Sequence, residues 1–317
     1  MDSLIYSLNA TIPIFAVMVV GYILKKINLI NEQFADVANK LVFKVCLPCM
    51  LFLNVKDTDI LHNFDGKYIG FCASVTLISI IVIWSMAKLL LKDKTLVGAF
   101  VQCSYRSSAA ILGIAFIQNI YGDSGMGPLM IIGAVPLYNI FAVTILTFES
   151  NDTSTKNDKT KIKTAFINIL KNPIILGIFA GLLASLINLH LPEMVEKTVT
   201  SLGSLTSPLA LVAIGAGFEG RKALAKIKPT ICASFIKLIG LALVFIPVAI
   251  FLGFTNEKLL AVLIMLASPT TPTAYIMAKN MHGDDILSSS IIVLTTLLSA
   301  FTLTGWIFIL RFLGYMM

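Results

Sequence analysis

The stretch Ser268-Pro269-Thr270-Thr271-Pro272-Thr273 interrupts a long apolar run between Leu259 and Met281. The run is long enough to cross a membrane, because a spanning helix needs about 20 mostly apolar residues. Proline has no amide hydrogen and clashes with the carbonyl one turn earlier. The two prolines therefore predict a helix that breaks near the membrane centre and frees the carbonyls of Met265 and Ser268.

A break at this depth restricts what can surround it. Unpaired backbone groups are costly in hydrocarbon, so a break survives only inside protein or beside a water-filled cavity. A kink packed among neighbouring helices is the simpler interpretation. Two prolines among four hydroxyl residues favour instead a discontinuous helix that lines a site.

The composition places the chain in a membrane, since 57% of its 317 residues are hydrophobic and 13% are charged. The net charge of +7 is attributed to loop lysines facing an anionic membrane surface, so no nucleic acid is expected as a partner. The five cysteines lie in apolar runs, where a disulfide framework is not expected, and the three histidines lie in loops. Because the chain has no metal-binding or phosphate-binding motif, we expect no metal, no cofactor and no enzymatic activity.

Ten membrane spans are expected, and all of them should be helical. They cover approximately residues 4–24, 37–55, 68–91, 95–121, 126–148, 172–190, 196–218, 229–252, 257–281 and 285–311. The polar stretch 149–171 is expected to be a cytoplasmic loop. It divides the chain into residues 1–148 and 172–317, with five spans in each half.

The distribution of lysine and arginine predicts the orientation of the spans. With the N-terminus outside, fourteen of these residues fall in inward loops and five fall at outward positions. We therefore expect a multi-pass protein of the cell (plasma) membrane with both termini outside the cytoplasm.

The two halves match at a constant offset of 160 residues. The matching pairs include Pro13 and Pro173, Gly21 and Gly181, Asn28 and Asn188, and Pro48 and Pro208. Because each half has an odd number of spans, the second half would be inverted in the membrane. Inverted repeats with a site at their interface are typical of secondary transporters.

The same offset places Ser268 and Pro269 opposite Ser107 and Ser108 of the fourth span. The stretch 104–108 is therefore a second polar interruption, at the matching depth of the first half. Paired interruptions of this kind indicate a transport site.

Arg106 is the most informative single residue of this second interruption. An arginine at a helix centre costs about 2.5–3.5 kcal/mol on insertion scales. It could bond the carbonyls freed by the breaks, or it could bind an anion. Lys237 adds a second positive charge, although its long side chain could reach toward the membrane surface. Apart from Glu196, Glu257 and Asp285, which are the first residues of their spans, no Asp or Glu lies inside the ten spans, so the charges of the membrane core predict an anionic ligand.

The other candidates are hydroxyl residues and prolines at the two breaks, with Asn139 and Pro48. Asn139 could orient a ligand or join two helices. Pro48, matched by Pro208, could bend its span around a cavity or form a simple kink. The full set of candidate substrate-binding residues is Arg106, Ser107, Ser108, Ser268, Pro269, Thr270, Thr271, Pro272, Lys237, Asn139 and Pro48.

Three stretches resemble the auxin efflux carrier family, which includes bacterial malate permease-like members. They are residues 41–52, residues 207–215, and residues 106–113 followed by Tyr121-Gly122-Asp123. The resemblance implies a scaffold of spans one, two, six and seven, and a transport bundle of spans three to five and eight to ten. It also implies that the fourth and ninth spans cross where both are broken, and that elevator-like movement gives alternating access. The family often has Asn at Ser108 and Pro at Ala115, which predicts a less complete break in the fourth span here.

We therefore expect a bacterial secondary transporter that exports a small organic anion, such as a dicarboxylate or an auxin-like aromatic acid. Its expected partners are this anion and the lipid bilayer. The sequence neither predicts nor excludes a homodimer. One alternative is a sodium-coupled symporter of the bile acid symporter type, with Na⁺ on the freed carbonyls. Another is an anion channel. Away from the ends of the spans, the membrane core contains no carboxylate or histidine that would carry a coupled proton.

Overall fold

The computed structural model describes residues 2–56, 65–109, 117, 121, 126–149, 167 and 170–316, with side chains from residue 12 onward. Every regular element in these ranges is helical. The predictions that concern Gly113, Ala115, Gly122-Asp123, His62 and most of the loop 149–171 fall outside the described residues.

The described helices overlap the predicted spans. They are α1 (Asp2–Lys26), α2 (Glu32–Leu41), the π-helix η1 (Val42–Cys46), α3 (Leu47–Lys56), α4 (Gly66–Leu90), the 3-10 turn η2 (Lys94–Leu96), α5 (Val97–Tyr105), α7 (Gly127–Phe148), α9 (Pro173–Leu186), α10 (Glu193–Ser204), α11 (Thr206–Gly217), α12 (Gly220–Ala225), α13 (Ile227–Phe235), the π-helix η4 (Ile236–Gly240), α14 (Leu241–Phe251), α15 (Asn256–Ala267), α16 (Thr273–Asn280) and α17 (Asp285–Phe312).

Five helical stretches within the described ranges are long and apolar enough to cross a membrane. They are α4, α7, the α10–α11 stretch, the α13–α14 stretch and α17. Asn31, Asp65 and Asp284 cap α2, α4 and α17 by accepting a backbone N–H with the side chain. The chain is thus all-helical over these ranges and has the apolar helices of a multi-pass membrane protein.

The predicted break in the ninth span is confirmed. Helix α15 ends at Ala267 and α16 begins at Thr273, so residues 268–272 lie between them. The fourth span is also interrupted, because α5 ends at Tyr105 and residues 106–108 continue without helical structure. Both breaks occur at the polar stretches that the sequence singled out.

Two pairs of helices pack backbone to backbone through glycine. Gly21 of α1 lies against Val212 of α11, and Gly181 of α9 lies against Phe52 of α3. A Cβ atom on either glycine would clash with the carbonyl oxygen of its partner, so only glycine allows these approaches. The two contacts are related by the 160-residue offset.

The offset also relates two unusual backbone conformations. Asn28 and Asn188 have φ angles of 59° and 48°, and each is the second residue after the end of its helix, α1 or α9. Asparagine tolerates this left-handed region because its short side chain can bond locally. The matched sequence positions therefore have matched local structure.

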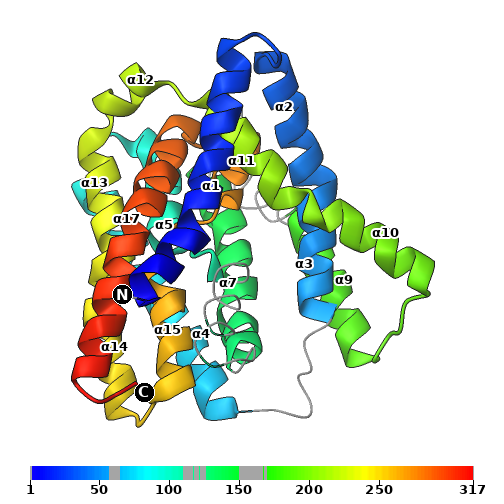
Figure 1. Cartoon of the computed structure of the whole chain (residues 1–317). Coiled ribbons are helices and arrows are strands. Elements are labelled where there is room, and N and C mark those ends of the chain that lie inside the picture. Colours follow the sequence, from blue (N-terminus) through cyan, green and yellow to red (C-terminus); the bar gives the residue numbers. More distant parts are fainter. Residues whose placement is uncertain are drawn as a thin grey trace.

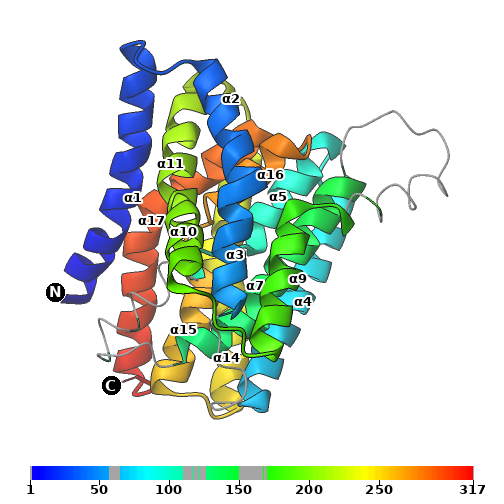
Figure 2. The same cartoon turned by 90° about the vertical axis from the view of Figure 1, so that its right-hand side faces the viewer.

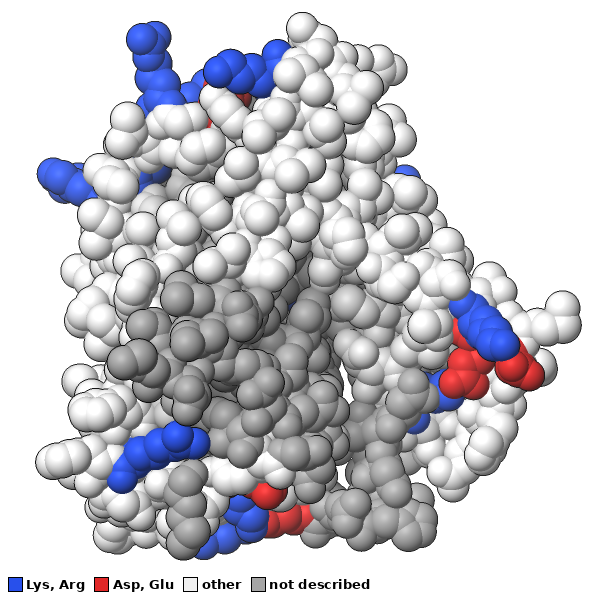
Figure 3. Space-filling view, in the orientation of Figure 1, with Lys and Arg blue, Asp and Glu red and all other residues white. Residues whose placement is uncertain are grey.

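Most helices stand side by side, and α10 reaches outward from the others (Figures 1 and 2). The last turn of α1, which carries Lys25 and Lys26, lies at the same end of the molecule as α12. Both chain termini lie toward the opposite end (Figures 1 and 2). On the face drawn in Figure 3, charged side chains gather at these two ends and on α10, and most of the described surface between them is uncharged.

Candidate functional site

The two interrupted spans are joined to each other by hydrogen bonds. The amide of Ser108 donates to the carbonyl of Pro269 at 3.0 Å. Thr270 Oγ1 donates to the carbonyl of Cys103 at 2.7 Å, and Gln102 Nε2 donates to the carbonyl of Ala274 at 3.0 Å. The polar groups that each break exposes are therefore partly satisfied by the other break.

At the end of α15, side chains replace the missing backbone amides as hydrogen-bond donors. The carbonyl of Met265, which the prolines were predicted to free, accepts from Ser107 Oγ at 2.5 Å and from Tyr138 Oη at 3.2 Å. Lys237 Nζ lies 3.4 Å from the same oxygen and 2.6 Å from the carbonyl oxygen of Leu266. These bonds satisfy carbonyls that have no helical partner, as a buried helix end requires.

Arg106 is buried, with 3% of its surface exposed, and it bonds neutral side chains rather than these carbonyls. Its Nη2 donates to Asn139 Oδ1 at 2.9 Å and to Thr273 Oγ1 at 3.0 Å. Its Nη1 lies 2.6 Å from the sulfur of Met277, and its Nε has no hydrogen-bond partner. No salt bridge to Arg106 exists among the described residues.

Asn139 holds the guanidinium in place. Its Nδ2 donates to the carbonyl of Val135 one turn earlier on α7, at 2.9 Å, which leaves Oδ1 to face Arg106. The buried positive charge therefore has oriented neutral acceptors and, within the described part of the chain, no acidic side chain to balance it. Because a buried ion without a counter-charge is costly, this arrangement suits an anionic ligand.

A small cavity of about 30 Å³ lies beside Arg106, which is room for about one water molecule. Five of the predicted site residues line it: Arg106, Ser107, Ser108, Asn139 and Thr271. The opposite wall comes from α3, through Leu47, Met50, Leu51 and Asn54. Substrate pockets are typically about ten times larger or more, so the cavity in this conformation is too small to hold a substrate.

The other predicted residues do not line this cavity. Lys237 points at the end of α15. Ser268, Pro269, Thr270 and Pro272 build the break itself. Pro48 lies against Gly177 of α9, where its backbone and ring leave no room for a Cβ on the glycine. For Lys237 and Pro48 the structure thus favours a packing or capping role over direct contact with a ligand.

Four polar residues at the site were not among the candidates from the sequence. Asn54, Tyr138 and Thr273 line the cavity, and Gln102 joins the two breaks. Thr273 belongs to the polar stretch 268–273 that interrupts the ninth span, and Tyr138 precedes Asn139, so the sequence carried a signal for both. Gln102 is a buried amide one turn before Arg106, which is also a usable signal.

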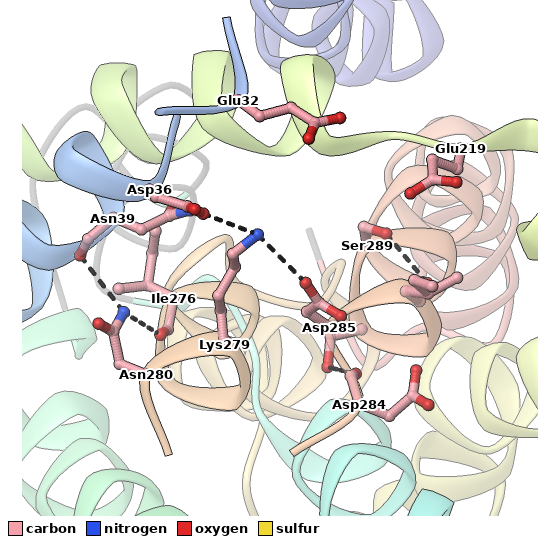
Figure 4. A network of polar contacts seen from close by, with 12 residues as sticks. Glu32, Asp36, Asn39, Glu219, Ile276, Lys279, Asn280, Asp284, Asp285 and Ser289 are labelled. Atoms are coloured by element: carbon pink, nitrogen blue, oxygen red, sulfur yellow. Dashed lines mark hydrogen bonds and ion pairs between the residues drawn. The ribbon is translucent and has the colours of Figure 1, made fainter. Parts of the chain in front are cut away.

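A network of polar contacts connects α2 with α16 and α17 (Figure 4). Lys279 Nζ lies 3.1 Å from Asp36 Oδ1 and 3.4 Å from Asp285 Oδ2. Beside this pair of contacts, Asn280 Nδ2 donates to the carbonyl of Asn39 at 3.4 Å. Helix α2 is therefore tied to the helix that begins at the break of the ninth span.

The first turn of α15, at the end away from the break, also makes an ionic contact. Lys258 Nζ lies 2.7 Å from Asp65 Oδ2, at the start of α4, and this hydrogen bond lowers the pKa of Asp65. Tyr68 Oη donates to the carbonyl of Lys258 at 3.2 Å. These contacts hold α4 and α15 together.

Comparison with known proteins finds a transporter family and several transporter relatives. The family described as "Membrane transport protein" matches residues 6–307. The uncharacterised transporter YfdV of Escherichia coli is 23% identical over 97% of this chain and 99% of its own length. An uncharacterised transporter of Methanocaldococcus jannaschii is 23% identical over 95% of this chain and 98% of its own length.

A third relative has a name that mentions a substrate. The protein of Rhizobium meliloti that is named "Putative malonate transporter" is 24% identical over 95% of this chain and 94% of its own length. Since the family match extends over nearly the whole sequence, the chain belongs to the membrane transport protein family, the family of the auxin efflux carriers.

Proposed function

We propose that this transporter carries a small organic carboxylate across the cell membrane, with Arg106 as the residue that binds the carboxylate group. The observation that carries the proposal is the buried guanidinium, which has oriented neutral partners and no acidic one among the described residues. Arginine binds carboxylates in a two-pronged geometry, and burial strengthens such a bond. The relative named for malonate, a dicarboxylate, supports the same class of substrate.

The proposed architecture is ten membrane helices in two inverted repeats, residues 1–148 and 172–317. The paired glycine contacts and the paired asparagine conformations support it, because each pair is related by the same 160-residue offset. In this arrangement α1, α2–α3, α9 and α10–α11 form the scaffold. The remaining membrane helices form the transport bundle.

We further propose elevator-like movement of the bundle against the scaffold. The cavity lies between α3 of the scaffold and the broken spans of the bundle, and it is too small for a substrate. Binding therefore requires the two parts to separate. A negative cell interior favours export, since about 2.3 kcal/mol per charge per 100 mV biases a monoanion outward roughly 50-fold.

A ligand screen on the purified full-length protein tests the substrate class. We expect malonate or another small dicarboxylate to raise the thermal unfolding midpoint, because a ligand at 100 times its Kd stabilises the folded state by about 2.7 kcal/mol. Malonamide, which has the same size without charge, is the matched control and should have no effect. Labelled malonate should also show counterflow in liposomes, which a channel would not. A protein that responds to no carboxylate in either assay contradicts the proposal.

The contact between Lys279 and Asp36 gives a test of the movement. Within the described part of the chain, it is the one salt bridge that joins the proposed scaffold to the proposed bundle. Loss of this salt bridge should favour opening of the site toward the end of the molecule where α2 begins. Exposed pairs contribute about 0.2–1 kcal/mol, so Lys279→Met should raise the open population by about 1.4- to 5-fold.

The measurement is the rate at which an impermeant maleimide, applied from the end where α2 begins, labels a cysteine placed at Ser108. The native cysteines are replaced for this experiment. Asp36→Asn should have the same effect as Lys279→Met, and the double variant should add little. Lys25→Met is the control, since its partner Glu32 belongs to the same proposed scaffold. Equal labelling rates in all variants would contradict a latch between the two parts.

A further inference from the structure

Lys237 is a buried lysine whose ammonium group has unusual surroundings. It lies in the π-helix η4, and none of its surface is exposed. Its Nζ donates to the carbonyls of Leu266 and Met265, the last turn of α15 before the break. No salt-bridge partner of Lys237 exists among the residues that the structure describes.

The helices that pack against η4 place their charges elsewhere. On α15 the charged residues are Glu257 and Lys258, in the first turn, and on α17 they are Asp285 and Arg311, near the two ends. Among the described residues, the hydrogen bonds of the ammonium therefore go to backbone oxygens alone. The carbonyl end of a helix carries a partial negative charge, which favours a cation at this place.

In transporters with broken helices, unwound carbonyls and the carbonyl ends of half-helices coordinate the coupling cation. In this protein the carbonyl oxygens at the end of α15 already accept hydrogen bonds from the ammonium of Lys237. We propose that the ammonium of Lys237 is a tethered cation that occupies the position of a coupling Na⁺ at the end of α15, so that transport does not require Na⁺. This position is linked to the carboxylate site, because the carbonyl of Met265 also accepts from Ser107 and Tyr138.

The prediction can be tested without a substrate, on purified protein in NaCl, KCl or choline chloride at equal ionic strength. The wild-type unfolding midpoint should be the same in the three salts. Lys237→Ser removes the ammonium, leaves room and adds an oxygen ligand. We expect a lower midpoint for this variant in choline, and a rise of several degrees that saturates with Na⁺. Lys237→Met fills the same space without charge, and it should be destabilised without any response to Na⁺.

Either of two results would overturn the proposal: a specific stabilisation of the wild type by Na⁺, or a Lys237→Ser variant that responds to Na⁺ no more than Lys237→Met does. If Lys237→Ser does not fold, the wild type decides. Malonate counterflow in liposomes, which rests on the proposed function, should change less than twofold when choline replaces Na⁺. A Na⁺ requirement would refute the tethered cation, whereas absence of any carboxylate transport would refute only the proposed substrate.

Discussion

Arg106→Ala is expected to weaken the binding of a small dicarboxylate by roughly 10- to 150-fold, since a charge-assisted hydrogen bond contributes about 1.5–3 kcal/mol. The physical reason is that the guanidinium is the buried positive group beside the cavity, and Asn139 and Thr273 keep it in position. Arg106→Lys should recover only part of the affinity, because lysine keeps the charge but loses the paired donors. The measurement is the Kd from calorimetry or from ligand-dependent unfolding.

A second variant separates ligand binding from a structural role of this arginine. Asn139→Asp would place a carboxylate where Oδ1 now accepts from Nη2, at 2.9 Å, and would neutralise Arg106 inside the protein. It should lose affinity as Arg106→Ala does, although the arginine is still present. Thr270→Val is the control, since it removes a buried bond between the two breaks away from the cavity lining. It should lower the unfolding midpoint and leave the Kd unchanged.

The outcome that would exclude Arg106 from the site is an unchanged Kd in Arg106→Ala protein that is as stable as the wild type. The ends of the broken helices would then be the remaining elements that could bind an anion. A fall in stability without a change in affinity would point to the same conclusion.

The double variant Pro269→Ala with Pro272→Ala is expected to fold and to transport at less than about a tenth of the wild-type rate. Each proline disfavours a continuous helix by about 3 kcal/mol relative to alanine, so the two changes remove about 6 kcal/mol of that bias. If the helix continues through residues 268–272, the carbonyl of Met265 is used in a helical bond. Ser107, Tyr138 and Lys237 then lose their shared acceptor.

The assay is transport per folded molecule, with helix content measured by circular dichroism. Pro247→Ala is the matched control, because Pro247 lies inside the uninterrupted helix α14. It should keep its transport rate. A double variant that is well expressed and transports normally would show that the break has no part in transport, even though its position was correctly predicted.

The break in the ninth span could be predicted because its cause is local. Pro269 and Pro272 lie within four residues of each other and strongly disfavour a continuous helix at residues 268–272, whereas a single proline such as Pro247 is accommodated inside α14; α15 ends and α16 begins on the two sides of this stretch. The apolar runs that form α4, α7 and α17 could also be predicted from the sequence, since length and composition alone decide whether a helix can cross a membrane. Arg106 stood out because an arginine in the middle of a span is costly.

The direction of the buried side chains could not be predicted in the same way. Lys237 and Arg106 have the same signal in the sequence, a basic residue within an apolar run, and yet Arg106 lines the cavity whereas Lys237 caps α15. The wall formed by α3 and the contact between Lys279 and Asp36 likewise join residues far apart in the chain. Local chemistry determined which residues are exceptional. The packing of whole helices decided what each one touches, because the rotation of a helix about its axis depends on all of its neighbours at once.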